Sequence, residues 1–440
     1  MASRIRHTLI LITWITILLL ACKEEKKPAR ADHAIQIPAT PDTVSLFFCG
    51  DIIQHLPQIY DAHNPTEKDY KYLKCFRYIA PYWHDSDFVI ANLETTLSDK
   101  EYSGYPRFSS PWQIARDLQR LGVTTFVTAN NHCCDQLARG ITKTIYYLDS
   151  LGIAHTGIFM DTLSYKKRNP LYLRKDNFKI ALLNYTYGTN GLPIPKGFVV
   201  SLIDTTVIKR DIQQAKRDSA TNIIAFMHWG YEYHTSPNKE QKALATWLHA
   251  QGADIVIGSH PHVVQPIEYI LSGKDTVGVT AYSLGNFISN QSYKGTDGGI
   301  CIRLTLTRPE AKTTRYTMET IKFYTYRPFE EGRTRYYVVP EALSDSIIKD
   351  YHLIKSKRFF KTQNGYWQAG GYGKGYIANM EAISAFVKSK GVGYKADDAA
   401  KNDRGNFVLG GVDTGASVAS FKDYYKLAQK AYENRSEIQG

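Results

Sequence analysis

The sequence lacks the features that identify several common classes of protein. It has no CxxC pair, no zinc-finger spacing and no basic-aromatic RNA motif, so we expect no binding to nucleic acid. No internal repeat is evident, and the apolar run at residues 9–21 is too short for a comfortable transmembrane helix. What remains is a globular protein whose function has to be inferred from separate polar residues along the chain.

Cysteine is also scarce. If the first cysteine carries lipid, as argued below, an odd number remains, and their spacing indicates no disulfide framework. A disulfide between the neighbours Cys133 and Cys134 would be strained. We therefore expect the rest to be buried free thiols. The six cysteines are Cys22, Cys49, Cys75, Cys133, Cys134 and Cys301.

Length, composition and charge fit an ordinary folded protein with a basic surface. Apolar residues make up 43% and charged residues 22% of the 440 residues, which is enough for a sizeable core and for two or three domains. The formal net charge is +12, and it falls to +10 if a leader containing Arg4 and Arg6 is removed. This excess predicts either attraction to anionic polymers or lipid headgroups, or simply a solvated, lysine-rich surface.

The N-terminus has the pattern of an export signal. Arg4 and Arg6 precede the apolar run, which ends in the lipobox-like sequence LLAC at residues 19–22. We expect Cys22 to be acylated and to anchor the protein in a membrane, although an uncleaved anchor helix is the alternative. Residues 23–43 are polar and proline-containing and are predicted to be a flexible tether, so that residues 1–22 form the signal. The expected location is the periplasmic face of a membrane or the outer-membrane surface.

From residue 44 onward, short apolar runs alternate with helical patterns. This alternation predicts an α/β domain over residues 44–327, with an α-rich extension over 328–440. Strands are expected at 44–49, 88–91, 125–129, 223–227, 254–258, 276–283, 299–307 and 315–326, and helices at 112–121, 141–151, 238–251, 341–354, 377–390 and 421–433.

Five of the predicted strands end in Asp, Asn, Glu or His. Because ligands of α/β sheets bind beyond the carboxyl ends of strands, these side chains are expected to meet in one place. Oxygen ligands and imidazoles are what a hydrolytic centre with one or two divalent ions (Mn, Fe or Zn) requires. Each signal alone is weak, and the His-Pro-His turn is the strongest. The predicted metal ligands are Asp51, Glu94, Asn131, His228, His260 and His262.

Several stretches resemble the CapA family of capsule-synthesis (poly-γ-glutamate biosynthesis) proteins. They are FFCGDI (47–52), DFVIANLE (87–94), FVTANNHCCD (126–135), HWGYEYHTSP (228–237), GADIVIGSHPHVVQPIE (252–268) and YSLGNF (282–287). The resemblance covers about residues 44–305. Since that family is similar to calcineurin-like metallophosphoesterases, it implies a four-layer α/β/β/α fold with metals at the strand ends.

The resemblance also implies roles for residues around the metals. Asn131 would bind metal, while His132 would contact the substrate and protonate a leaving group after attack by a metal-activated water. Residue type alone, apart from the resemblance, predicts that Asp135 orients His132. The residues expected to line the substrate site are Asn130, Asn92, Glu232, Tyr233, Tyr282 and Asn286, with Ser283 beside them.

Two departures from the family pattern put hydrolysis in question. The first motif usually has a His two residues after its Asp, but Ile53 stands there; His55 could substitute or could simply line the loop. The usual bridging Asp is replaced by Glu94. We therefore weigh a metal-dependent hydrolase of a phosphoester or polymer linkage against a non-catalytic accessory that handles an anionic capsule polymer, together with capsule-assembly proteins. An inert scaffold is a third possibility.

Overall fold

The computed structural model describes residues 42–308, 314–330 and 332–343, and the backbone of four short strands beyond them. The predicted signal, Cys22, the tether up to residue 41 and the helices at 377–390 and 421–433 lie outside these residues. Of the helix predicted at 341–354, only the 3₁₀ turn Glu341–Leu343 is described. Within the described part, no helix has both the length and the apolar character needed to cross a membrane.

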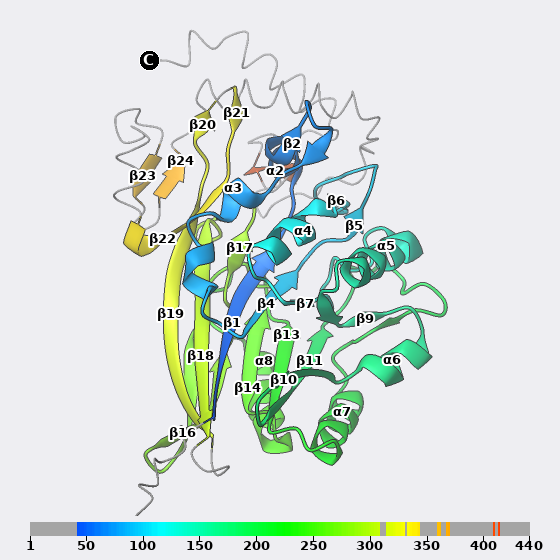
Figure 1. Ribbon diagram of the computed structural model, residues 1–440, viewed down its shortest axis with the longest axis vertical. Coiled ribbons are helices and arrows are strands. Elements are labelled where there is room, and N and C mark those ends of the chain that lie inside the picture. Colours follow the sequence, from blue (N-terminus) through cyan, green and yellow to red (C-terminus); the bar gives the residue numbers. More distant parts are fainter. Residues whose placement is uncertain are drawn as a thin grey trace, which may run out of the picture. The chain divides into compact units, whose positions relative to one another are not determined.

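Two large sheets form the framework (Figure 1). The first has the order β22-β19-β18-β1-β4-β7-β8, with β17 paired to β1, and the second has the order β10-β11-β13-β14-β16-β15. The strands of the first sheet are β1 (Asp42–Ile52), β4 (Phe88–Leu93), β7 (Thr125–Val127), β8 (Ala154–Thr156), β17 (Asn286–Ile288), β18 (Gly298–Arg308), β19 (Arg315–Tyr326) and β22 (Tyr337–Pro340). Those of the second are β10 (Leu171–Lys175), β11 (Phe178–Thr186), β13 (Asn222–His228), β14 (Ile255–Ser259), β15 (Ile267–Ser272) and β16 (Asp275–Ala281).

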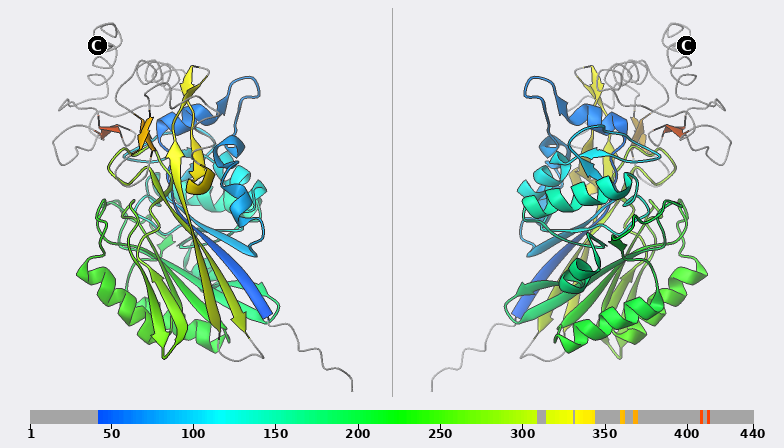
Figure 2. Two further views of the ribbon diagram at one scale, coloured as in Figure 1. Left: turned by 90° about the vertical axis from the view of Figure 1, so that its left-hand side faces the viewer. Right: turned by 90° about the vertical axis from the view of Figure 1, so that its right-hand side faces the viewer.

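The sheets pack face to face, and helices cover their outer faces (Figure 2). Side chains such as Phe48 of β1 and Phe226 of β13 share the core between the sheets. Outside the first sheet, residues of α2 to α5 pack into a second core, and outside the second sheet α7 and α8 form a third. The expected α/β/β/α layering is therefore confirmed. The helices are α2 (Leu56–Ala62), α3 (Leu73–Phe76), α4 (Gln113–Arg120), α5 (Leu137–Ser150), α6 (Thr162–Arg168), α7 (Thr205–Arg217) and α8 (Lys239–Gln251).

The central strands are apolar runs because both of their faces are covered. All residues of β13 and of β14 are buried, as expected for parallel strands between two layers. Smaller pairs decorate the loops: β2 (His63–Asn64) with β3 (Asp69–Tyr70), β5 (Leu97–Ser98) with β6 (Ser110–Pro111), β9 (Ile158–Phe159) with β12 (Val199–Val200), β20 (Phe329–Glu330) with β21 (Arg333–Thr334), β23 (Phe359–Lys361) with β24 (Trp367–Ala369), and β25 (Val408–Leu409) with β26 (Val412–Asp413). A further 3₁₀ turn spans Ala80–Trp83.

The eight predicted strands and three of the predicted helices are present, with ends shifted by a few residues. The sequence pattern predicts no strand at β8, β10, β11, β15 or β17 and no helix at α2, α3, α6 or α7, all of which the structure contains. The first sheet also continues through β22, which pairs with β19 beyond residue 327. The five described cysteines are buried free thiols, as predicted.

The parallel direction of neighbouring strands brings the polar residues at their carboxyl ends close together. In the first sheet β1, β4 and β7 are mutually parallel neighbours, and Asp51 lies in register with Asn92. In the second sheet β11, β13 and β14 are parallel neighbours, and His228 lies in register with Ser259. The carboxyl ends of both sets meet at the same edge of the sandwich, because Asp51 of β1 accepts a hydrogen bond from the main-chain N–H of His260, which follows β14.

Candidate metal centre

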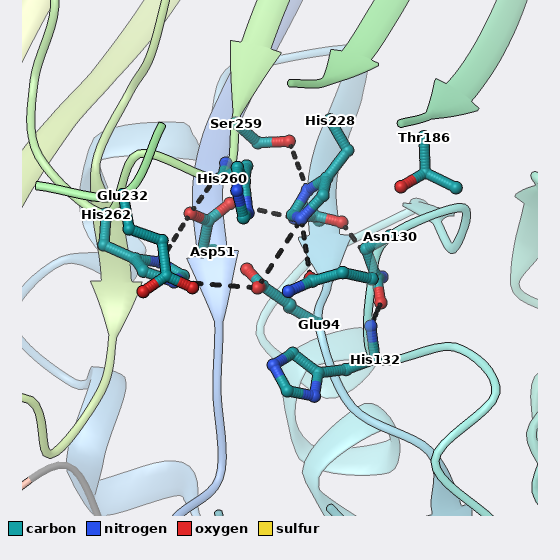
Figure 3. Close-up of polar contacts among 12 residues, drawn as sticks. Asp51, Glu94, Asn130, His132, Thr186, His228, Glu232, Ser259, His260 and His262 are labelled. Carbon is teal, nitrogen blue, oxygen red and sulfur yellow. Dashed lines mark hydrogen bonds and ion pairs between the residues drawn. The ribbon is translucent and has the colours of Figure 1, made fainter. Parts of the chain in front are cut away.

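Five of the six predicted ligands form one buried cluster between the two sheets (Figure 3). Two groups of donor atoms, each within 4.8 Å of one another, could hold a cation. One group is Glu94, His260 and His262, and the other is Asp51, Glu94 and His228. Glu94 belongs to both groups, so its carboxylate could serve as a ligand in either.

Asp51 is the residue around which the first sheet's side of the cluster is organised. Its Oδ1 accepts a hydrogen bond from Asn92 Nδ2 at 2.8 Å. Its Oδ2 accepts one from the main-chain N–H of His260 and lies near His262 Nδ1, each at 3.2 Å. These contacts join the end of β1 to the turn after β14, so Asp51 fixes the His-Pro-His turn as well as offering a ligand oxygen.

His228 at the end of β13 connects the two sheets. Its Nε2 is 2.8 Å from Asn131 Oδ1 and 3.6 Å from Glu94 Oε1, so the sixth predicted ligand, Asn131, adjoins the cluster through His228. Its Nδ1 is 2.9 Å from the hydroxyl of Ser259, which is also 3.2 Å from the carbonyl of Met227. When Nδ1 donates to Ser259, Nε2 keeps the lone pair that a metal needs.

Burial controls the protonation of the cluster. Burial, followed by the nearby Asp51, raises the pKa of Glu94 well above its usual range. Burial, followed by the neighbouring imidazoles, lowers the pKa of His228 and His260 well below theirs. Burial also acts to lower the pKa of His262, but the hydrogen bond with Asp51 and the charge of Glu232 outweigh it and raise the value.

Three buried atoms of the cluster that could bind a metal have no hydrogen-bond partner among the described residues. They are both carboxylate oxygens of Glu94 and Nδ1 of His260. Leaving such atoms unpaired costs about 1–3 kcal/mol each, and more if they are charged. A divalent cation would satisfy all three at once and would compensate the buried negative charge. Mixed nitrogen and oxygen donors suit Zn, Mn or Fe. The residues present therefore fit a metal.

The backbone at the turn after β14 is strained in a way that aims both imidazoles. His260 has φ of 93° and His262 has φ of 59°, in the left-handed region that non-glycine residues seldom adopt. Strain of this kind costs on the order of 1–3 kcal/mol per residue and concentrates at functional sites. Residues without special demands on their side chains would relax to an ordinary turn.

His132 and Asp135 form the contact predicted from their residue types. His132 Nδ1 is 2.8 Å from Asp135 Oδ2, which also accepts a hydrogen bond from the main-chain N–H of Phe108 at 2.6 Å. The Phe108 ring packs edge-on against the imidazole, with centroids 4.6 Å apart. The orientation of His132 is therefore fixed by one carboxylate and one aromatic ring.

The predicted substrate residues divide into three groups. Asn92 and Asn130 are fully buried and support the site from behind, since Asn130 Nδ2 donates to Leu93 O at 2.8 Å and its Oδ1 accepts from the N–H of His132 at 3.1 Å. Glu232 faces the cluster: its carboxylate is 3.9 Å from His262 Nε2, and its side chain is 40% exposed.

Tyr233 and Asn286 also lie beside the cluster. The Tyr233 ring is 6.1 Å from His262 and packs on Tyr293. Asn286 is in register with Asp51. Tyr282 lies elsewhere, because it packs against Trp229 in the core under α7 and α8 and donates to Glu268 at 3.0 Å. The expectation that Tyr282 lines the substrate site does not match this position.

His55 occupies a loop position and belongs to neither of the two ligand groups described above. Its Nδ1 is 3.1 Å from Gln58 Oε1 and accepts from the main-chain N–H of Asn290 at 3.2 Å. This favours the loop-lining interpretation over substitution for the missing ligand at Ile53, which is buried apolar.

Two residues at the site were missed by sequence reasoning. Ser259 is not among the predicted site residues, although its hydroxyl contacts His228. Tyr187 follows β11 and is 49% exposed, with its ring 4.6 Å from that of His260. The signal was available, since the apolar run of β11 also ends in polar and aromatic residues.

Comparisons with known proteins agree with the resemblance. Residues 45–291 match the family model described as bacterial capsule synthesis protein PGA_cap. The chain is 26% identical over 310 residues to the capsule biosynthesis protein CapA of Bacillus anthracis, covering 66% of this chain and 70% of that protein. It is 29% identical over 270 residues to the PGA biosynthesis protein CapA of Bacillus subtilis (strain 168), covering 58% of this chain and 66% of that protein, just under two thirds of its length.

Solved structures give looser matches. The 5'-nucleotidase from Candida albicans SC5314 aligns with a TM-score of 0.39 and 10% identity, over 79% of this chain and 58% of that chain. The protein TT1561 of Thermus thermophilus aligns with a TM-score of 0.33 and 10% identity, over 63% of this chain and 98% of that chain. The fold assignment rests on the sheets and layers described above.

Proposed function

Because the chain belongs to the PGA_cap family of bacterial capsule synthesis proteins, we propose that it is a cell-envelope protein of the CapA type whose metal centre hydrolyses a phosphoester or polymer linkage of the capsule. The observation that carries this proposal is the pair of ligand groups that share Glu94. Such an arrangement is what two-ion hydrolysis uses, whereas a purely structural ion needs one closed set of ligands.

Two sets of residues have separate roles in the proposed reaction. Asp51, Glu94, His228, His260 and His262 would hold one or two ions, and those ions would supply Lewis acidity and charge stabilisation at the scissile centre. Asp135 accepts a hydrogen bond from Nδ1 of His132, so Nε2 is the ring nitrogen left for the substrate; in the imidazolium form it would donate to a substrate oxygen or protonate the leaving group.

Glu232 stands at the exposed side of the cluster, and its carboxylate is 3.9 Å from His262 Nε2. A negative charge there disfavours the approach of a second anionic group from that side. It would therefore direct an anionic substrate toward the His132 side of the cluster.

A second candidate function is a non-catalytic accessory that binds an anionic capsule polymer. The observation that favours it is the buried apolar Ile53, which leaves one ligand position of the family pattern without an imidazole. A weakly held second ion would still attract an anionic polymer but would not activate hydrolysis.

The proposal includes anchoring by acylated Cys22, so that the protein faces the periplasm or lies on the outer-membrane surface beside other capsule-assembly proteins. Its support is the lipobox-like sequence at residues 19–22. Mass spectrometry of the N-terminal peptide tests it: an unmodified, uncleaved terminus would refute the anchor.

The function is tested with the full-length chain in mild detergent, supplied with Mn, Fe or Zn in turn. We expect bound metal by elemental analysis and turnover of bis(p-nitrophenyl) phosphate. His260→Ala should lower turnover by at least about 100-fold, as expected for loss of a metal ligand. The matched control is His84→Ala, since the side chain of His84 is 88% exposed. Metal-loaded protein without turnover would favour the accessory role, and protein that binds no metal would contradict hydrolysis.

A further inference from the structure

The side-chain amide of Asn286 carries a buried oxygen whose role the contacts within the protein do not explain. Asn286 is the first residue of β17 and is 0% exposed. Its Oδ1 has no hydrogen-bond partner among the described residues. A buried acceptor that is left unpaired costs about 1–3 kcal/mol, so this oxygen calls for a partner from outside the described chain.

The orientation of this amide is fixed by its nitrogen. Asn286 Nδ2 donates to the main-chain carbonyl of Thr296 at 2.9 Å and to Gln291 Oε1 at 2.8 Å. A main-chain carbonyl can only accept a hydrogen bond, so the NH₂ end of the amide has to face Thr296. The amide cannot turn over without placing two acceptors against each other. Oδ1 is therefore directed away from Thr296 and Gln291.

The position of β17 in the first sheet brings Asn286 to the metal centre. β17 is parallel to β1, and Asn286 is in register with Asp51. The main-chain N–H of Asp51 donates to Gly285 O at 3.1 Å, and that of Ile53 donates to Ile288 O at 2.9 Å. The start of β17 therefore runs directly along the chain from Asp51 to Ile53. Residues in register on neighbouring strands project to the same face of a sheet, so the side chains of Asn286 and Asp51 share one side.

The imidazole of His262 lies beside the same amide. Burial acts to lower the pKa of His262, whereas the hydrogen bond with Asp51 and the charge of Glu232 act to raise it, and the side chain of Asn286 acts in the same direction as those two. An oxygen next to the imidazole has this effect, because it favours the charged form. Since His262 Nδ1 is also 3.2 Å from Asp51 Oδ2, the side chains of Asp51, His262 and Asn286 converge on one place.

We propose that Asn286 is a metal ligand whose Oδ1 binds an ion beside Asp51 and His262. Ile53, which follows β1, is buried and apolar and offers no donor atom to the ion. The amide of the neighbouring strand supplies an oxygen to this side of the cluster instead. A neutral amide oxygen is a hard donor of the kind that suits Mn. The ion would then satisfy the oxygen that the chain leaves unpaired.

This inference rests on the proposed function only for the presence of an ion at the cluster, and it does not depend on hydrolysis. Its test therefore measures metal binding and not turnover. A chain that binds Mn through Asn286 but hydrolyses nothing would support this assignment while refuting the hydrolase. A chain that hydrolyses its substrate and binds Mn equally well without the Asn286 amide would refute this assignment alone.

The first measurement titrates the metal-free, full-length chain with Mn by calorimetry in mild detergent. Asn286→Ala should weaken binding at least about tenfold, because it removes a ligand. The matched control is Asn222→Ala. Asn222 is 2% exposed, its Oδ1 is also unpaired among the described residues, and its Nδ2 donates to the Tyr316 hydroxyl at 3.0 Å. It lies at the amino end of β13, whereas His228 lies at the carboxyl end, so this variant should keep the wild-type affinity.

The second measurement distinguishes a ligand from a residue that only packs. Thiolates are soft ligands that bind cadmium, so Asn286→Cys with cadmium should show an ultraviolet sulfur-to-cadmium charge-transfer band stronger than any in the wild type or in Asn222→Cys. Because cysteine restores a ligand, this variant tests the assignment even where Asn286→Ala folds poorly. Unchanged Mn affinity in Asn286→Ala, no additional band in Asn286→Cys, or a wild-type chain that binds no Mn would each overturn the assignment.

Discussion

The hydroxyl of Ser259 lies 2.9 Å from Nδ1 of His228, on the side of the imidazole away from Glu94 and Asn131. When Nδ1 donates to this hydroxyl, Nε2 keeps its lone pair as a ligand; in the other tautomer Nε2 donates to Asn131 Oδ1. Residue-scale chemistry of this kind decides whether a buried cluster binds metal or only packs. The residue that hydrogen-bonds to a candidate ligand is therefore as informative about metal binding as the ligand itself.

Ser259→Ala should therefore weaken metal binding about 10- to 100-fold, the range expected for losing a group that orients a ligand. The measurement is titration of the metal-free chain with Zn or Mn by calorimetry. Ser45→Ala is the matched control, because the Ser45 hydroxyl on β1 has no partner among the described residues. Unchanged affinity in Ser259→Ala would show that His228 does not depend on this contact.

His55 provides a test of burial at the residue scale. Burial lowers its pKa from 6.5 to about 3, so the imidazole is neutral in the folded protein. Below pH 6.5 the unfolded chain takes up a proton that the folded chain does not, and the free energy of unfolding falls by about 1.4 kcal/mol per pH unit down to about pH 3.

His55→Asn removes this titration but keeps an oxygen that can accept from the N–H of Asn290. Between pH 6.5 and pH 5 the wild type should lose about 2 kcal/mol more stability than this variant, measured by urea unfolding at both values. The exposed His84→Asn is the control and should follow the wild type. Parallel losses in His55→Asn and the wild type would mean that the buried imidazole is already charged.

The residue types at the site could be predicted from the sequence, but the partners of several could not. Asp51, His228 and the two histidines of the HPH turn were found because each follows an apolar run. Tyr282 follows such a run too, yet it packs on Trp229 away from the cluster, since a strand's end does not reveal which face a side chain will take. Ser259 gave no signal, because serine after a strand is ordinary turn chemistry.

At the scale of elements, the close approach of β1 to the chain before β17 places Asp51. The N–H of Asp51 donates to Gly285 O at 3.1 Å, and a Cβ on Gly50 would lie 2.0 Å from that same oxygen. Only glycine leaves room for this contact. Position 50 therefore requires glycine for a steric reason that acts directly on the candidate ligand Asp51 next to it.

Gly50→Ala should push β1 and residue 285 apart, lower the free energy of unfolding by several kcal/mol and reduce metal binding with it. Thermal unfolding and elemental analysis measure the two effects. Gly188→Ala is the control, because a Cβ there meets no atom within 4 Å. A Gly50→Ala protein with wild-type stability would contradict the tight packing described for this junction.

Element types were predictable, but their pairing was not. The alternation of apolar and polar segments correctly indicated eight of the strands and three of the helices from β1 to β19. The pairing of β17 with β1 joins Asp51 to Asn286 across more than two hundred residues, and only the folded sheet supplies that information. β10 and β11 are not predicted, although β11 is apolar, because neither ends in a candidate metal ligand.

At the scale of the whole described domain, the site exists because two sheets present their carboxyl ends at one edge (Figure 3). The first sheet supplies the carboxylates Asp51 and Glu94, and the second supplies the imidazoles His228, His260 and His262. Neither sheet alone provides both kinds of donor. Metal binding should therefore report on the packing of the sandwich as well as on the individual ligands.

Elemental analysis of the full-length chain and of Glu94→Gln, both purified after growth with Mn, Fe and Zn, tests this claim most directly. Glutamine keeps the size of the side chain but removes the charge that both ligand groups share. The account predicts at least one equivalent of metal in the wild type and a content at least about tenfold lower in Glu94→Gln. A wild-type chain without metal, or a variant that retains the full content, would contradict it.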